Sequence, residues 1–191
     1  AIYTPQGPRD EAGLAYASAY GLATLQRIRD MIDRQPDQFA LARSADDARR
    51  IAASGKRVVF ISMENAEPLA ADPGLLRAYR RQGLSMLGLV HFTSNRFADS
   101  ATALPEWHGL NDKGRALVSE ANRLGILLGL SHASDAVFDQ VLALSRVPVI
   151  ASHSSSRAVN AHPRNLDDER LRQLAAKGGV VQVTAYSDYL I

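Results

Sequence analysis

The sequence LGILLGLSHASD at residues 124–135 is followed by a helical interval and then by VPVIASHSSSRAVNAHPRN at 147–165. Each segment begins with an apolar run, and each run ends in the dipeptide Ser-His, which places His132 and His153 at matching positions. Short apolar runs of this kind predict buried strands of a parallel sheet. We therefore expect both imidazoles at the carboxyl edge of one sheet, where α/β folds carry their chemistry.

The same alternation of strand and helix extends through the rest of the chain. Apolar and β-branched runs predict strands at 2–4, 39–42, 57–63, 84–90, 126–130, 147–151 and 180–185. Helical spacing and capping residues predict helices at 10–35, 45–53, 72–80, 111–123, 136–144 and 167–177. Residues 92–110 form one long irregular segment, a feature that is usually functional or disordered. Strict alternation indicates a parallel sheet with right-handed crossovers.

These elements favour an α/β fold of the (β/α)₈ TIM-barrel type. Neither GxGxxG nor GxxxxGK[ST] occurs in the sequence, which weakens the case for a nucleotide-binding Rossmann fold. Such barrels typically need about 250 residues, whereas this chain has 191. We therefore expect residues 1–191 to form a single barrel domain that lacks its first and last strands.

Composition places the chain among ordinary globular proteins, with 46% hydrophobic and 22% charged residues. The 22 Lys and Arg residues are dispersed among 20 Asp and Glu residues, so we expect no nucleic-acid partner. No apolar run reaches the roughly 18 residues of a membrane span. The absence of Cys excludes disulfides and thiolate metal ligands. The compartment stays open between the cytoplasm and an extracytoplasmic or membrane-anchored location, and a homodimer is one option for the assembly.

Four potential metal ligands follow four consecutive predicted strands: Glu64, His91, His132 and His153. A single histidine at such a place is more often a hydrogen-bonded, partly buried residue than a ligand. Here, however, three of the five histidines in the chain end strands. Imidazole and carboxylate are ligands that Zn²⁺ takes in catalytic sites, which leave one position for water. The pattern therefore predicts a metal site at the sheet edge.

Other polar residues near this edge are weaker candidates. Arg164 lies in the loop after the strand that carries His153, where a guanidinium could pair with a substrate carboxylate. In the same loop His162 is a candidate supporting residue, whereas His108 is more typical of a surface or lid position. Tyr186 and Tyr189 are interpreted from position alone as residues that plug the end of the barrel.

Two further groups are interpreted as structural. Ser131 and Ser152 precede the histidines but lack the glycines of a nucleophile elbow, so we expect them to pack at the strand ends. The Asp135 and Asp139 pair, like the carboxylates at 167–168, fits a helix start and a solvated face better than catalysis.

The ordered motifs of the chain resemble the membrane dipeptidase (renal dipeptidase) family. They are MENA at 63–66, LVH at 89–91 with ADS at 98–100, GLSHASD at 129–135, ASHSSSRAV at 151–159, HPRN at 162–165 and KGGVVQV at 177–183. The resemblance extends over essentially the whole chain and suggests a bacterial-type member. It implies a (β/α)₈ barrel with a two-zinc centre that hydrolyses dipeptides and tolerates a D-residue at the C-terminal position.

The resemblance also implies roles for single residues. Glu64 resembles the carboxylate that bridges the two zincs, and His132 with His153 resembles the imidazoles that complete the second metal. His91 is similar to the histidine that contacts the tetrahedral intermediate. The substrate-binding positions of the family fall on His91, Arg164 and Tyr189.

Two family features do not occur in these residues. The family takes further ligands of its first zinc from a His-x-Asp motif on the first strand, and it uses an Asp at the end of the last strand. Neither is found here, so we expect the chain to be a segment of a longer enzyme. Two alternatives stay open: another amidohydrolase-like metal hydrolase acting on a lactone, cyclic amide or phosphoester, and a barrel without catalysis that binds or scaffolds.

Overall fold

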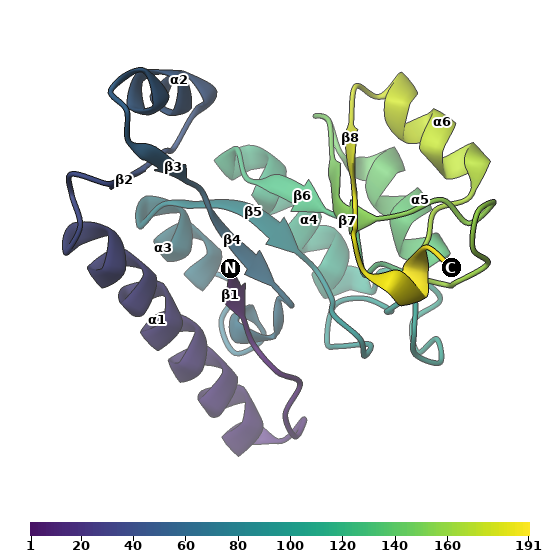
Figure 1. Ribbon diagram of the computed structural model, residues 1–191. Helices are drawn as coiled ribbons and strands as arrows, with labels where there is room; N and C mark the ends of the chain where they lie inside the picture. Colours follow the sequence, from purple (N-terminus) through teal and green to yellow (C-terminus); the bar gives the residue numbers. More distant parts are fainter. The chain divides into compact units, whose positions relative to one another are not determined.

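The computed structural model describes residues 1–191 and divides them into two compact units. The N-terminal unit comprises Ala1–Met86 and the C-terminal unit Leu87–Ile191, with strand β5 (Leu84–Gly88) running across the division. Each unit has the α/β character and the parallel strand pairing that the sequence predicts (Figure 1). None of the helices combines the length and the apolarity that a membrane crossing needs.

A short parallel pair organises the N-terminal unit. Strand β1 (Ile2–Tyr3) pairs with β4 (Ile61–Glu64) so that Tyr3 lies opposite Glu64. The long helix α1 (Glu11–Asp33) packs against β1 and against the 3₁₀ turn η1 (Glu67–Leu69). This arrangement buries Ile2 and Met63 completely and places Glu64 at the carboxyl end of its strand.

The strand predicted at 57–63 is wrong as one continuous element. It divides at the half-exposed Phe60 into β3 (Arg57–Val59) and β4. Strand β3 pairs with β2 (Phe39–Leu41) in a separate two-stranded sheet, whereas β4 pairs with β1. An apolar run shows that residues can be buried in a strand, but it does not show that its two halves have different partners.

Helix boundaries follow the predicted capping residues. The side chains of five residues accept a hydrogen bond from the backbone N–H three positions further on: Asp10, Ser44, Asn111, Ser134 and Asp167. They begin α1, α2 (Ala45–Ala53), α4 (Asp112–Leu124), α5 (Asp135–Leu144) and α6 (Asp168–Ala176). Such caps satisfy backbone donors that have no partner within the helix. The five predicted helices are confirmed.

The helix predicted from residue 72 begins later than expected: α3 spans Leu75–Arg81. The Asp72 side chain accepts from the Gly74 N–H at 2.8 Å in a turn before the helix. Such local hydrogen bonding competes with the helical conformation.

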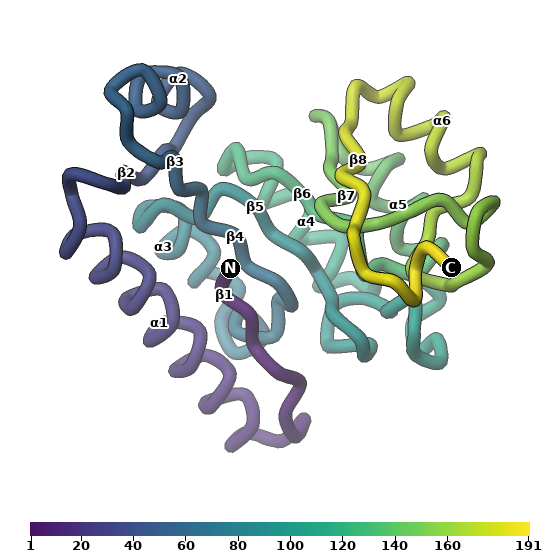
Figure 2. Tube along the Cα trace, in the orientation of Figure 1, coloured from purple at the N-terminus to yellow at the C-terminus, as the bar shows by residue number.

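In the C-terminal unit, β6 (Leu127–Gly129), β7 (Ile150–Ser154) and β8 (Val180–Val183) are parallel neighbours in that order. Helix α4 precedes β6 along the chain, α5 connects β6 to β7, and α6 connects β7 to β8; Figure 2 traces the path from β7 through its loop into α6 and β8. Helix α4 is capped at its C-terminal end by Gly125, which has a left-handed conformation with φ of 65°. Glycine adopts this conformation without the steric strain that a Cβ would cause.

The positions of the histidines relative to the strands differ from the prediction. Strands β5 and β6 end at Gly88 and Gly129, so His91 and His132 lie in the segments that follow. His153 lies inside β7, where the pairing with β8 is irregular between Ala151 and Ser154. Irregular pairing re-aims side chains. The apolar runs therefore locate the strands but not their final residues.

Close packing at Gly21 of α1 predicts a stability effect. A Cβ at this position would lie 2.6 Å from the Tyr79 hydroxyl and 2.9 Å from the Pro68 Cβ. Tyr79 is fully buried, and burial raises its pKa to about 12. We expect Gly21→Ala to lower the free energy of unfolding by about 1–3 kcal/mol through overpacking, despite a helix-propensity gain of about 1 kcal/mol.

Urea unfolding followed by circular dichroism measures this change. Gly7→Ala is the control, because no atom lies within 4 Å of a Cβ built there. Equal stability of Gly21→Ala and the parent protein would contradict the packing argument.

Candidate metal centre

Three imidazoles gather in the C-terminal unit. The His132 ring lies between the other two, with centroids 4.2 Å from His91 and 4.9 Å from His153. The Nε2 atoms of His132 and His153 are 2.9 Å apart. His132 is 6% exposed, while the other two rings are partly exposed. The loops after β5 and β6 thus meet β7 at one cluster of nitrogen donors.

The two close nitrogens suit a divalent metal ion. In a tetrahedral zinc site with bonds of about 2.0–2.1 Å, two imidazole nitrogens lie about 3.3 Å apart. The separation of 2.9 Å between His132 and His153 is close to this value. Neutral imidazoles cannot point two lone pairs at each other at such a distance without a proton or a cation between them. The donor set therefore fits a metal ion.

Hydrogen bonds hold His153 on three sides. Its Nδ1 is 2.9 Å from the Ser152 Oγ, its backbone N–H donates to the Ser131 Oγ at 2.9 Å, and its carbonyl accepts from an Arg164 guanidinium nitrogen at 3.4 Å. The two serines, which we expected only to pack at the strand ends, thus also make hydrogen bonds to His153. The Ser-His dipeptide was a signal for Ser152, which lies beside the ring that it contacts, but not for Ser131, which reaches the backbone of a histidine 22 residues further on.

The irregular segment 92–110 fixes the other two imidazoles. Ser100 Oγ donates to the His91 carbonyl at 2.5 Å, and the Ala101 N–H donates to the His132 carbonyl at 2.9 Å. Phe92 contacts both rings edge-on, at centroid distances of 4.2 Å from His91 and 5.1 Å from His132. Two consecutive residues of this segment, Ser100 and Ala101, thus hold the backbone of both histidines.

Asp99 gives the same segment its shape. Its side chain is 1% exposed and accepts from the backbone N–H groups of Glu106, Trp107 and Gly109 at 2.8, 3.1 and 2.9 Å. A buried carboxylate with three such donors is well compensated. His108 lies on the exposed side of this turn with φ at 51°, which agrees with the predicted surface position.

Glu64 lies in the N-terminal unit at the end of β4. The next residue, Asn65, has φ at 75°, which is uncommon for a residue with a Cβ. The Asn65 side chain stabilises this turn by donating to the Thr4 carbonyl at 2.9 Å and accepting from the Glu67 N–H at 3.2 Å. A sharp, hydrogen-bonded turn therefore ends the strand directly after the carboxylate.

Arg164 and Tyr189 also come together. The Arg164 side chain is 2% exposed, and its guanidinium carbon lies 5.4 Å from the centre of the Tyr189 ring. His162 packs on the same tyrosine at 4.6 Å between centroids and accepts from the Arg164 N–H at 3.1 Å. Tyr186 is 55% exposed and contacts the Tyr189 ring at 4.8 Å.

Comparison with known proteins identifies the family. The model of the membrane dipeptidase family, peptidase family M19, matches residues 1–191. The chain belongs to the membrane dipeptidase family. Dipeptidase verJ of Clonostachys rogersoniana is 39% identical over 166 residues, which cover 85% of this chain and 43% of that protein.

Two solved structures of similar proteins support the same conclusion. The probable dipeptidase PvdM from Pseudomonas aeruginosa has a TM-score of 0.90 and 32% identity, covering 96% of this chain and 48% of that one. A metallopeptidase from Rhodobacter sphaeroides, liganded with a phosphinate mimic of the dipeptide L-Ala-D-Ala, has a TM-score of 0.86 and 29% identity, covering 95% and 59%. The chain therefore spans about half the length of its relatives.

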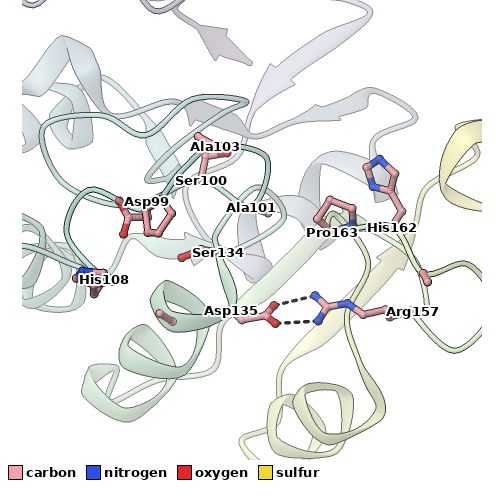
Figure 3. A pocket seen from close by; sticks show the side chains of 13 residues that line it. Asp99, Ser100, Ala101, Ala103, His108, Ser134, Asp135, Arg157, His162 and Pro163 are labelled. Carbon is pink, nitrogen blue, oxygen red and sulfur yellow. Dashed lines mark hydrogen bonds and ion pairs between the residues drawn. The ribbon is translucent and has the colours of Figure 1, made fainter.

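In this member of the membrane dipeptidase family, ion pairs anchor the loop that carries His162 and Arg164. Arg157 donates to both Asp135 carboxylate oxygens at 2.8 Å, which raises the pKa of the arginine (Figure 3). Its Nε also donates to the Asn165 carbonyl at 2.9 Å. The Asp135 carboxylate is therefore part of an inter-element ion pair as well as a helix start.

A cavity of about 570 Å³ lies beside this ion pair. Its lining includes Ser100 and Ala101, which hold the imidazole-bearing segments, together with His108 and His162. Figure 3 shows the two histidines on opposite sides of the cavity. The cavity thus lies next to the residues that hold the backbone of His91 and His132. The imidazoles of His108 and His162 are not close together across it.

The Asp167 carboxylate at the start of α6 predicts how stability depends on pH. Its pKa is lowered, first because the Arg170 backbone N–H donates to it, and also because the guanidinium groups of Arg170 and Arg157 lie close. A carboxyl with a lowered folded pKa contributes stability above its unfolded pKa of about 3.9. That contribution disappears as the pH falls through the folded value. We therefore expect Asp167→Asn to reduce Tm at pH 7 and to have little effect at pH 2.

Thermal melts across this pH range test the charge, because Asn can also cap a helix. Asp168→Asn is the matched control, since its ion pair with Arg172 is mostly exposed and such pairs contribute little. The same loss of Tm in Asp167→Asn at both pH values would exclude the electrostatic explanation.

Proposed function

We propose that this chain is part of a zinc-dependent dipeptidase that hydrolyses dipeptides with a free C-terminal carboxylate, including those with a C-terminal D-residue. The observation that carries the proposal is the 2.9 Å separation of the His132 and His153 Nε2 atoms in a member of the M19 family. The binding of an L-Ala-D-Ala mimic by a relative supports the substrate class.

The proposed fold of the intact enzyme is one (β/α)₈ barrel domain. The parallel pairs of both units and the TM-score of 0.90 to PvdM support this proposal. In it, residues 1–191 supply most of the strands, and the first and last strands come from flanking sequence. This part of the proposal is supported by the observation that the chain covers only 48% of PvdM.

The proposed metal ligands are Glu64, His132 and His153, in a centre that holds two zinc ions in the complete enzyme. Two imidazoles and a carboxylate form a common catalytic ligand set for zinc. A zinc ion held by these residues would supply a water with a pKa near 7 and a Lewis acid for the amide carbonyl. Hydrogen bonds from Ser152 and Ser131 hold the His153 end of this ligand set.

The remaining proposed site residues bind and orient the substrate. His91 lies against His132 and donates a hydrogen bond to the carbonyl oxygen as negative charge develops on it. Arg164 pairs with the C-terminal carboxylate, and the Tyr189 ring beside it limits the space around that end. An ion pair formed at a buried guanidinium is less screened than one in water. This requirement for a free carboxylate restricts the substrates to short peptides.

Replacement of His153 tests the metal assignment. We expect His153→Ala in the full-length protein to lose the metal at that site and to lower kcat/KM by several orders of magnitude, because one of two close nitrogen donors is removed. Zinc content is measured by mass spectrometry after dialysis. His108→Ala is the control, since this histidine is exposed and outside the cluster. Full metal content and turnover in His153→Ala would reject the assignment.

The C-terminal carboxylate of the substrate tests the role of Arg164. We expect kcat/KM for L-Ala-D-Ala to exceed that for its C-terminal amide by about 10–100-fold, because a hydrogen bond to a charged group contributes about 1.5–3 kcal/mol. In Arg164→Gln the two substrates should be hydrolysed at similar, low rates. Equal rates in the parent enzyme would argue against a dipeptidase and for a different amide, lactone or phosphoester substrate.

A further inference from the structure

The two serines that precede the histidines meet at the same residue. Ser152 Oγ lies 2.9 Å from the His153 ring, and Ser131 Oγ accepts from the His153 backbone N–H at the same distance. Ser131 comes from the segment after β6, whereas Ser152 lies in β7 itself. The ring and the backbone of one proposed ligand are thus held by two hydroxyls, one from β7 and one from the segment after β6.

We propose that Ser152 and Ser131 are positioning residues of the metal centre. Ser152 sets the orientation and the tautomer of the His153 ring, and Ser131 sets its backbone at the irregular pairing of β7 with β8. Neither serine touches substrate in this proposal. The inference rests on the proposed function only in requiring that the enzyme binds a metal at this cluster.

The hydroxyl chemistry of Ser152 fits this role in both states of the site. Without metal, one of the two facing Nε2 atoms carries a proton, because they are 2.9 Å apart. When that atom belongs to His153, its Nδ1 accepts from Ser152. If Nε2 bound a metal, the neutral ring would carry its proton on Nδ1 and would donate it to Ser152. A hydroxyl both donates and accepts, so it satisfies either tautomer without moving.

Loss of this hydrogen bond should weaken metal binding through orientation. A metal-bound histidine normally donates its second ring N–H to a fixed acceptor, and removal of that acceptor typically costs 10–100-fold in metal affinity. The His153 ring is only partly buried, so packing alone does not restrict its rotation. Ser152 is therefore expected to reduce the alternative orientations of the ring.

Ser154, two residues after Ser152 in the same strand, provides a matched control. Ser154 is fully buried in β7, and its hydroxyl has no hydrogen-bond partner. Ser154→Ala removes the same atoms as Ser152→Ala from the same strand, but it breaks no hydrogen bond to His153. A general effect of serine removal on the strand would appear in both variants.

The experiment uses full-length enzyme freed of metal and titrated with Zn²⁺ against a competing chelator. We expect Ser152→Ala to raise the zinc Kd by about 10–100-fold, Ser152→Thr to restore it to within about threefold, and Ser154→Ala to leave it unchanged. Ser131→Ala should raise the Kd as well, which provides an independent variant if Ser152→Ala does not fold. Tm of each metal-free protein separates metal binding from folding.

Two results would overturn the inference. One is a normal zinc Kd in both Ser152→Ala and Ser131→Ala while the parent binds zinc. The other is the same increase in Ser154→Ala as in Ser152→Ala, which would indicate a general strand effect. Failure of the proposed function is distinguishable, because the parent enzyme would then bind no zinc or hydrolyse no dipeptide.

Discussion

The close approach of the His132 and His153 imidazoles is the constraint on which the rest of the site depends. Two ring nitrogens at 2.9 Å repel each other unless a proton or a cation lies between them. The surrounding structure must therefore hold both rings in place. Hydrogen bonds hold the His153 ring and the backbone of both histidines. The rings of His91 and Phe92 pack on the His132 ring.

The loops around the cluster explain how a partly exposed site can be rigid. Segment 92–110 has little regular secondary structure, yet the buried Asp99 carboxylate binds three of its backbone donors. The loop after β7 is held by the Arg157 ion pair to Asp135 and by the Asn165 amide, which donates to the Tyr189 carbonyl at 2.8 Å. Buried or bidentate polar contacts of this type fix irregular backbone that no strand or helix supports.

Membership of the M19 family gives these contacts a chemical context. A hydrolase that activates water with a metal needs ligands in fixed orientations, because errors in ligand direction reduce metal affinity. Ser152 places a hydroxyl beside the adjacent His153 imidazole, and the Ser131 hydroxyl reaches the backbone of the same histidine. Local sequence therefore supplies a candidate ligand and a hydroxyl that can orient it.

Much of the fold could be predicted from the sequence because the relevant signals are local. Capping residues such as Ser44 and Asn111 mark helix starts through hydrogen bonds to residues three positions away. Apolar runs likewise mark the strands, and the family motifs indicate which histidines to examine. By contrast, the partners of a strand are not local. The apolar pattern of residues 57–63 does not indicate that this run divides at Phe60 between two sheets.

The amino-acid sequence by itself determined the element types, the starts of five helices, the family and the identity of the candidate ligands. Only the tertiary structure decided that Ser131 and Ser152 both hold His153, that Ser100 and Ala101 hold the other two histidines, and that Arg164 is buried beside Tyr189. The physical reason is that hydrogen bonds are directional and short. Their partners depend on how distant segments are placed to within a few tenths of an ångström, which periodicity and composition do not encode.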